Sequence, residues 1–421
     1  MTEKDRNIVR SLAGELAELA ALPIQAERIR MWKNSNGLRP NRPMIYMAAA
    51  EMPWGEITPH VDDLQCRCEN PALRRIEYDM RRKLFIAKHL ETDHVVEDTY
   101  WIEKKIDGDG FGLDVQEQLI ERADSSVASH HYEPVICDMD DIEKIRTPEI
   151  VYDEVRTRER AEFIDDLLGD ILPVKICGKR THTYNAWDTA VCWTGVTETL
   201  MDLLMRPDFC HAVMRRLTDA VLSRMDQMEA LGLLDHPNPR HTVGSGAAGY
   251  TDELPQADCD GERYRHKDIW GSSTSQIFSD VSPEMHEEFA VKYEVETLRR
   301  CGLTYYGCCE PLHNKMHILA GIPNLRKISI SPWCDTTKAV ENAARKYVFS
   351  HKPSPSVFAA ESFSIEEAEA DVRRRLECSR GMSCEVIAKD ITTCRGEVER
   401  LINWTRMAMR VAREFEPGSG T

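Results

Sequence analysis

The C-terminal half of the chain has the most regular pattern of hydrophobic and polar positions. From residue 268 onward, short apolar and β-branched runs alternate with longer stretches in which apolar residues recur at helical spacing. Short links rich in Gly, Pro, Asp and Ser separate them. This alternation is typical of parallel β/α units. The strands predicted in this half lie near residues 269, 303, 326, 347 and 385.

The N-terminal half is less regular and more charged. It predicts strands near residues 44, 96, 172 and 241. Helical spacing predicts one helix over residues 7–34, a charged amphipathic helix over 71–93, and two further helices ending near Met205 and Gly232. The methionines in the last of these recur at helical spacing and are therefore expected in the core.

These elements together favour one α/β domain. Nine predicted strands compete for the eight places of a (β/α)8 TIM barrel, so one of them must lie outside it. We expect a single barrel with an elaborated, largely helical N-terminal region. The expected boundaries are a helical extension over residues 1–40, the barrel over 41–415 and a disordered tail over 416–421.

Charge and cysteine content limit the partners and the compartment. The chain has 54 basic and 71 acidic residues, for a formal net charge of −17, which argues against nucleic acids and anionic membranes as partners. The first amphipathic stretch carries Glu15 and Glu18 in its middle, unlike a signal peptide or a membrane span. The 14 cysteines show no disulfide framework, so we expect a cytoplasmic protein.

The segment LTYYGCCEPLH, residues 303–313, has the most concentrated candidate chemistry. A short buried strand is predicted to stop at Gly307, and Cys308, Cys309 and Glu310 follow it. Thiolates and a carboxylate at a strand end could bind zinc. Buried cysteines are also common as small hydrophobic residues, so both interpretations stay open.

Polar and aromatic side chains follow other predicted strands, as they do at the mouth of a barrel. His182 is a candidate base or ligand there, and Lys389 with Asp390 could form either a catalytic group or a structural ion pair. The tryptophans near strand ends could line an apolar pocket or belong to the core. The candidate substrate-binding residues are Glu51, Trp54, Trp187, Trp270 and Gln276.

From about residue 40 the chain resembles the uroporphyrinogen decarboxylase superfamily, and within it the corrinoid-dependent methyltransferases. The resemblance is carried by WGSSTSQIFSDVSPEMHEEF, YYGCCEPLHNKMHILAGIPNLRKISISPW and VIAKDITTCRGEVERLINW. The decarboxylases have an arginine-rich M-R-Q-A-G-R motif after the first strand, where this chain has MAAAEMPWGE. A porphyrinogen carboxylate would meet Glu51 and Glu56 there instead of cations, so the resemblance favours methyl transfer.

The resemblance also implies a metal site. Zinc methyltransferases of this superfamily hold the metal with a His-x-Cys motif at one strand end and a cysteine near the end of the last strand. This chain has residues 306–308, Tyr-Gly-Cys, at the first position, and Tyr306 stands in place of the histidine. Cys334 is a further potential ligand, and a site without metal stays open. The predicted metal ligands are Cys308, Cys309, Glu310 and Cys394, and the predicted catalytic residues are Glu310, His182 and Asp390.

The expected function is transfer of a methyl group between a small substrate, such as a methyl ether, a methylamine or a thiol, and a corrinoid cofactor (cobalamin) on a partner corrinoid protein. Zinc would act as a Lewis acid on the atom that bears the methyl group. A cofactor-free decarboxylase acting on a small carboxylate is the alternative, and it needs a cationic anchor for its substrate. A non-catalytic member of a methyl-transfer complex is a third interpretation. The identity of the methyl donor and the formation of a homodimer stay open.

Overall fold

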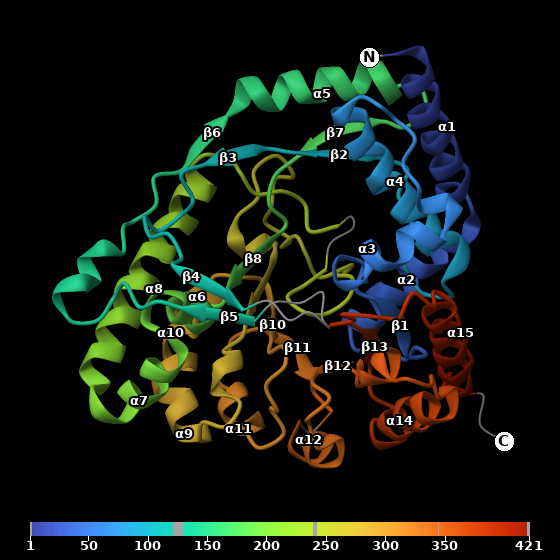
Figure 1. The fold of residues 1–421 in the computed structure, drawn as a ribbon. Coiled ribbons are helices and arrows are strands. Elements are labelled where there is room, and N and C mark those ends of the chain that lie inside the picture. The colour runs from blue at the N-terminus through green and yellow to red at the C-terminus, as the bar shows by residue number, and fades with distance from the viewer. Residues whose placement is uncertain (1, 121–128, 239–241, 344, 419–421) are drawn as a thin grey trace.

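A seven-stranded parallel sheet organises the fold in the computed structural model, which describes residues 2–120, 129–238, 242–343 and 345–418 (Figure 1). The strand order is β1-β13-β12-β11-β10-β9-β8, and every neighbouring pair is parallel. The predicted α/β class with a parallel sheet is thereby confirmed. The strands are β1 (Met44–Met47), β8 (Thr181–Tyr184), β9 (Trp270–Ser273), β10 (Leu303–Tyr306), β11 (Leu325–Ile330), β12 (Val348–His351) and β13 (Cys384–Ala388).

The sheet is not a closed eight-stranded barrel within the described residues, because its outer strands β1 and β8 do not pair with each other. The segment around Asp93 lies beside β1, on the edge where β1 would otherwise pair with β8. The Asp93 amide donates to the Ile45 carbonyl at 2.8 Å, and the Asp93 carboxylate accepts from the Ile45 amide at 2.7 Å. The Asp93 carboxylate thus accepts the hydrogen bond that a backbone carbonyl of a paired strand would accept. Strand-like hydrogen bonding between this segment and β1 therefore ends after one pair of bonds.

Two predicted strands exist but lie outside the main sheet. β2 (Tyr100–Glu103) and β7 (Val174–Cys177) form a separate parallel pair. Lys175 and Ile176 of β7 are exposed, whereas β9 and β10 are buried along their whole length. The apolar run near residue 172 is therefore not a barrel strand, and β8, which the sequence analysis missed, takes that place. Two antiparallel pairs also lie outside the sheet: β3 (Lys105–Asp107) with β6 (Val151–Asp153), and β4 (Glu117–Ile120) with β5 (Ser129–Tyr132).

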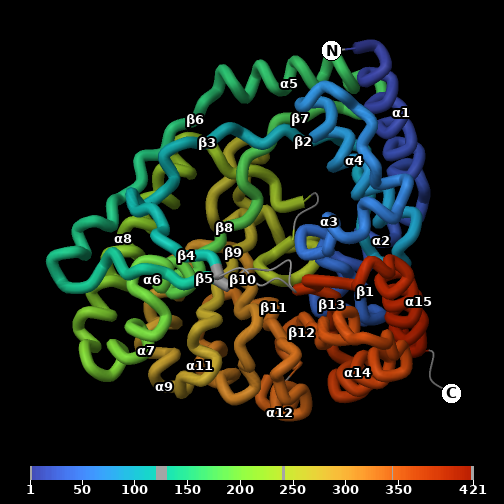
Figure 2. The backbone as a smooth tube through the Cα atoms, in the orientation of Figure 1, coloured from blue at the N-terminus to red at the C-terminus, as the bar shows by residue number. Residues whose placement is uncertain are grey.

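The strand predicted near residue 241 is not present in its described part, and residues 239–241 lie outside the described residues. Residues 243–251, here called the core loop, instead pass through the interior (Figure 2). Val243 and Ala247 are fully buried, and the core loop meets β13 where the Ala247 amide donates to Glu385 at 3.0 Å. Trp270 on β9 donates its indole N–H to the Gly249 carbonyl at 2.8 Å. The loop therefore fills the space that the parallel strands enclose.

The single helix predicted over residues 7–34 is two helices, α1 (Glu3–Ala20) and α2 (Pro23–Asn36). Pro23 occupies the first turn of α2, where its missing N–H leaves no hydrogen bond unmade. The buried face of α1 packs with α4 (Pro71–His89) and α5 (Glu154–Leu168) in a cluster of its own. The helix predicted to end at Met205 is likewise divided at Gly195, where φ is +80°.

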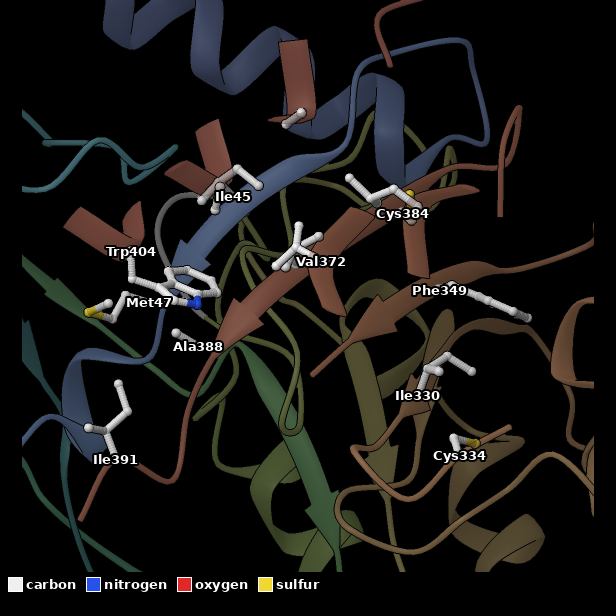
Figure 3. Packing of buried hydrophobic residues seen from close by; sticks show 14 of the residues in the cluster. Ile45, Met47, Ile330, Cys334, Phe349, Val372, Cys384, Ala388, Ile391 and Trp404 are labelled. Atoms are coloured by element: carbon white, nitrogen blue, oxygen red, sulfur yellow. The ribbon is translucent and has the colours of Figure 1, made fainter. Parts of the chain in front are cut away.

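Most of the other α-helices surround the sheet, and the largest hydrophobic cluster lies between helices and the outer side of the strands. Figure 3 shows Val372 of α14 and Trp404 of α15 in this cluster, with Trp404 beside Met47 and Ala388 of the sheet. Burial of each such large side chain stabilises the fold by about 1.5–3 kcal/mol. None of the helices in the described ranges is long and apolar enough to cross a membrane. The α-helices not yet given bounds are α3 (Trp54–Ile57), α6 (Ala186–Thr194), α7 (Val196–Met205), α8 (Pro207–Ala230), α9 (Pro283–His286), α10 (Lys292–Leu298), α11 (Met316–Leu319), α12 (Thr336–Ala343), α13 (Ser356–Ala359), α14 (Ile365–Cys378) and α15 (Glu399–Glu414).

Candidate active site around Cys308

Cys308 lies just after the C-terminal end of β10, where the ends of the parallel strands meet. Gly307 turns the chain there with φ of +97°. A Cβ atom at this position would also lie 2.5 Å from Leu312 Cδ1 and 3.0 Å from Ser329 Cβ, so only glycine fits. Thr274, Lys352 and Lys389 directly follow β9, β12 and β13 of the same sheet. The parallel order of the sheet therefore brings these residues to the same end as Cys308.

The Cys308 thiol is surrounded by hydrogen-bond donors. Its Sγ lies 3.6 Å from Cys309 Sγ, and the Lys389 ammonium donates to it at 3.4 Å. The hydrogen bond from Cys309 lowers the pKa of Cys308 to about 6, with further help from Lys352 and Lys389 and against the effect of burial. The same hydrogen bond and burial raise the pKa of Cys309. These contacts favour the thiolate form of Cys308 near neutral pH, and the thiolate is the nucleophilic form of cysteine.

Lys352 is a second cation near the Cys308 sulfur. Its Nζ donates to the Cys308 carbonyl at 3.2 Å, to Ser329 Oγ at 2.6 Å and to Tyr305 OH at 3.1 Å. It also bonds to Ser245 Oγ of the core loop. All four partners are uncharged oxygens, so the positive charge of this 1% exposed side chain stays available to stabilise the nearby thiolate.

Two further carboxyl groups lie near Cys308, the buried Glu310 and the partly buried Asp188. Glu310 accepts hydrogen bonds from the Cys308 amide at 2.9 Å and from Thr274 Oγ1 at 2.7 Å. Asp188, on α6, accepts from the backbone N and from Nε2 of Gln276 at 3.1 and 3.0 Å. Burial raises the pKa of Asp188 to about 6, with additional contributions from Glu310 and Cys308. With a pKa of about 6, Asp188 is mostly ionised at pH 7, and it can take up and release a proton close to neutral pH.

An ion-pair network lies at the outer edge of the site. Lys389 Nζ is 3.6 Å from Glu51 Oε1 and 3.6 Å from Asp390 Oδ1, and the Asp390 amide donates to Glu51 at 2.7 Å. Although burial favours the neutral amine, the charges of Cys308, Glu51 and Asp390 raise the pKa of Lys389. Asp390 also contacts Cys309, with 3.8 Å between Sγ and Oδ2. Of the two alternatives for Lys389 and Asp390, the ion pair is present and adjoins Cys308, and a catalytic role for Asp390 stays a prediction.

Three predicted site residues lie away from Cys308. Trp270 begins β9, at the opposite end of the strands, and its indole is bonded to the core loop. Trp187 is 1% exposed and donates to the Phe289 carbonyl at 2.9 Å, in the core beneath α6. His182 lies on the side of β8 that faces α8, 5.5 Å from the ring of His266. A fourth predicted site residue, Trp54, is nearly buried, and its indole N–H donates to the Ala49 carbonyl at 2.6 Å.

The described residues do not form a site that fits zinc. Cys394 is fully buried among hydrophobic side chains, and burial together with Glu56 raises its pKa to about 11. Both oxygens of Glu310 already accept hydrogen bonds, which leaves the thiols of Cys308 and Cys309 as two neighbouring donors. Within the described ranges no three His, Cys, Asp or Glu side chains are grouped to hold a metal ion. Zinc normally takes four ligands, so its presence stays a prediction of the resemblance.

The sequence analysis did not select Lys352, Ser245 or Asp188 as site residues. Lys352 had a usable signal, because it is a charged residue directly after the buried run YVFSH. Ser245 had none, because its position depends on the path of the core loop. Asp188 lies in an otherwise apolar helix, and only the fold shows that it approaches Cys308.

Comparison with known proteins does not place the chain in a family. No family model matches the sequence, and no curated protein matches it. Among solved structures, the fold is similar to that of a methyltransferase from Methanosarcina mazei, with 11% sequence identity and a TM-score of 0.48 over 92% of this chain and 98% of that chain. A likeness this distant assigns neither a family nor a function.

Proposed function

We propose that this protein is a methyltransferase that moves a methyl group between a small substrate and a corrinoid, and that Cys308 receives the methyl group. The observation that carries the proposal is the Cys308 thiolate, which lies at the C-terminal end of the parallel strands between Lys389 and Lys352. A thiolate is a strong nucleophile toward carbon. The resemblance of the segments around Cys308 to corrinoid-dependent methyltransferases supports the same reaction.

The step at Cys308 is a direct displacement. The Cys308 sulfur attacks the methyl carbon, a sulfur–carbon bond forms, and the bond between carbon and its oxygen, nitrogen or sulfur atom breaks. The electron pair stays on that leaving atom, which takes a proton that comes from solvent and that Asp188 can relay. Gln276 keeps the Asp188 carboxyl in place through two hydrogen bonds. A corrinoid carried by a partner protein would supply the other methyl acceptor or donor.

The surrounding charges set the reactivity of the thiolate. Lys389 and Lys352 stabilise the thiolate before the reaction and lose that interaction when the sulfur becomes an uncharged thioether. Glu310 accepts a hydrogen bond from the Cys308 amide and so fixes the backbone there, which holds the sulfur in one position. Residues that orient the nucleophile reduce the entropy that the reaction must lose.

The decarboxylase alternative has less support. A lyase of this kind needs an accessible cation to anchor a substrate carboxylate. Lys352 is 1% exposed and has four oxygen partners, and Lys389 is 5% exposed and paired with Glu51 and Asp390. Neither ammonium is therefore free to bind an incoming carboxylate.

The proposal is tested by incubating the protein with methylcobalamin and mapping methylated peptides by mass spectrometry. We expect an S-methyl group on Cys308, and loss of methyl transfer to or from methyl ethers, methylamines and thiols in Cys308→Ser. Cys309→Ala should slow the reaction without abolishing it, because it removes the hydrogen bond and not the nucleophile. Cys137→Ser is the matched control, because Cys137 is exposed and lies in another part of the chain.

Two results would contradict the proposal. Full methyl transfer by Cys308→Ser would show that another group accepts the methyl group. Release of carbon dioxide from a small carboxylate without cobalamin, in a protein whose Cys308 stays unmethylated, would support the lyase instead.

A further inference from the structure

Two adjoining cavities lie away from Cys308, where β8 faces α8 and where β3 meets α5. The outer cavity has a volume of about 410 Å³ and the inner one of about 180 Å³. Ile106, Asp109 and Lys179 line both cavities, so the two share a wall. The inner cavity ends at His182, the histidine that the structure places away from the thiolate site.

The outer cavity has more cations than carboxylates, in an acidic protein. Its lining has five cationic side chains and two carboxylates, although the whole chain has a net charge of −17. Lys105, Arg156 and Lys179 are paired with Asp107, Asp153 and Glu103, which leaves Arg160 and Lys104 without a carboxylate partner among the described residues. Such a local excess of cations concentrates anions. The cationic side chains are Lys104, Lys105, Arg156, Arg160 and Lys179, and the carboxylates are Glu103 and Asp109.

The inner cavity contains polar groups without a partner. His182 is nearly buried, and its Nε2 has no hydrogen-bond partner among the described residues. Arg224 lines the same cavity, where its guanidinium contacts the Phe111 ring at 5.2 Å and, among the described residues, pairs with no carboxylate. Buried polar groups normally have a hydrogen-bond partner, so a ligand that bonds to His182 and Arg224 would complete their bonding.

One part of the inner cavity is apolar. Ile106, Met225, Met228 and Leu234 form this part of the wall. Methionine side chains adapt to ligands of irregular shape. The inner cavity therefore suits the uncharged or weakly polar part of a small molecule, and the outer cavity suits its charged end.

We propose that the two cavities form one binding site for a small organic phosphate, separate from the Cys308 site. The phosphate lies in the outer cavity beside Arg160 and Lys104, where the arginine fork binds two phosphate oxygens. The organic part enters the inner cavity and reaches His182. An excess of cations over carboxylates matches a doubly charged phosphate better than a singly charged carboxylate.

Calorimetric titration with phenyl phosphate, inorganic phosphate and benzoate tests this site. We expect phenyl phosphate to bind more tightly than either of the others, because it alone occupies both cavities. Arg160→Gln should weaken phenyl phosphate binding about tenfold, the effect of losing one charge-assisted hydrogen bond. His182→Asn should weaken phenyl phosphate and leave inorganic phosphate unchanged, with folding checked by thermal unfolding.

Arg158→Gln is the matched control. Arg158 lies on the same helix, is paired with Glu154 at 2.6 Å and lines neither cavity, so its loss should leave binding unchanged. Cys308→Ser should also leave binding unchanged, which separates this site from the methyl-transfer proposal. Equal weakening by Arg158→Gln and Arg160→Gln, benzoate binding as tight as that of phenyl phosphate, or no binding of phenyl phosphate would each overturn the proposal.

Discussion

Lys327 and Glu385 form an ion pair in the interior of the sheet, with 2.9 Å between Nζ and Oε2 and both side chains 0% exposed. The two residues come from β11 and β13, with β12 between them. Each also holds the core loop: Glu385 accepts from the Ala247 amide at 3.0 Å, and Lys327 donates to the Ala248 carbonyl at 3.3 Å. The ion pair therefore connects β11 and β13 to the core loop, which fills the space that the strands enclose.

Removal of one member of this pair should destabilise the protein strongly. Lys327→Met leaves the Glu385 carboxylate buried without its cation, so we expect the free energy of unfolding to fall by about 3–5 kcal/mol. Lys327→Met/Glu385→Met should lose less than the sum of the two single variants. Chemical denaturation measures all three. Lys338→Met is the control, because its pair with Asp335 is exposed and should contribute less than about 1 kcal/mol. Additive effects of the two interior substitutions would contradict the ion pair.

The C-terminal strands could be predicted because their burial leaves a simple pattern. β10, β12 and β13 are buried along their whole length and appear in the sequence as short apolar runs between turn residues. The closure of the barrel could not be predicted in the same way. The run at residues 171–178 is as apolar as a barrel strand, and only its partner β2 determines that it lies outside the sheet. Strand pairing is a non-local property that local pattern does not contain.

The candidate site, like the fold, is only partly predictable from the sequence. Cys308, Cys309 and Glu310 could be found because they are consecutive in the sequence and follow a predicted strand. Lys352 and Ser245 belong to the same group, but they are separated by more than a hundred residues and meet only through the core loop. The pKa of Cys308 depends on such contacts, so the thiolate could not be deduced from the sequence alone.

Cys309→Ala should raise the pKa of Cys308. The hydrogen bond from Cys309 is the main cause of its pKa of about 6, and a hydrogen bond to a charged group is worth about 1.5–3 kcal/mol, or about one to two pH units. The thiolate forms above the pKa, so the variant should reach a given alkylation rate only at a higher pH. Iodoacetamide labelling of the Cys308 peptide across a pH series measures this change. Cys137→Ala should leave the profile in place, and an unchanged profile in Cys309→Ala would show that Lys352 and Lys389 suffice.

Glu294→Gln should change how stability depends on pH. Glu294 is fully buried and accepts hydrogen bonds from Tyr306 OH at 2.7 Å and from Ser275 Oγ at 2.8 Å, and burial raises its pKa from the usual 4.5 to about 7. The folded protein favours the protonated acid, so its stability contribution is full below about pH 4.5 and is lost as the pH rises through about 7. Glutamine does not ionise and avoids that loss.

Between pH 4.5 and pH 7 the unaltered protein should therefore lose unfolding free energy relative to Glu294→Gln. The loss should be on the order of 3 kcal/mol, at about 1.4 kcal/mol for each pH unit. Glu284→Gln gives a contrast of opposite sign, because hydrogen bonds from its own backbone amide and from Ser282 lower the pKa of Glu284. Parallel stability curves for Glu294→Gln and the unaltered protein would contradict a raised pKa.

Gly246→Ala should disturb both the core loop and the thiolate. A Cβ atom at this position would lie 2.6 Å from Tyr305 Cε2 and 3.0 Å from Glu385 Oε1, closer than real contacts allow. Tyr305 is fully buried, and its hydroxyl accepts from Lys352 at 3.1 Å, so the ring cannot move without displacing that ammonium. We expect a loss of about 1–3 kcal/mol in unfolding free energy. The pKa of Cys308 should rise as well, because Lys352 is one of the charges that lower it.

Gly14→Ala is the matched control for this substitution. Gly14 lies within α1, and a Cβ atom there would have no neighbour from outside its own helix within 4 Å, so alanine should stabilise the helix by up to about 1 kcal/mol. Denaturation and the pH profile of Cys308 alkylation are measured on both variants. A Gly246→Ala protein that keeps full stability would show that the core loop does not pack against Tyr305. A loss of stability with an unchanged alkylation profile would show that the loop supports the fold without controlling the charge beside Cys308.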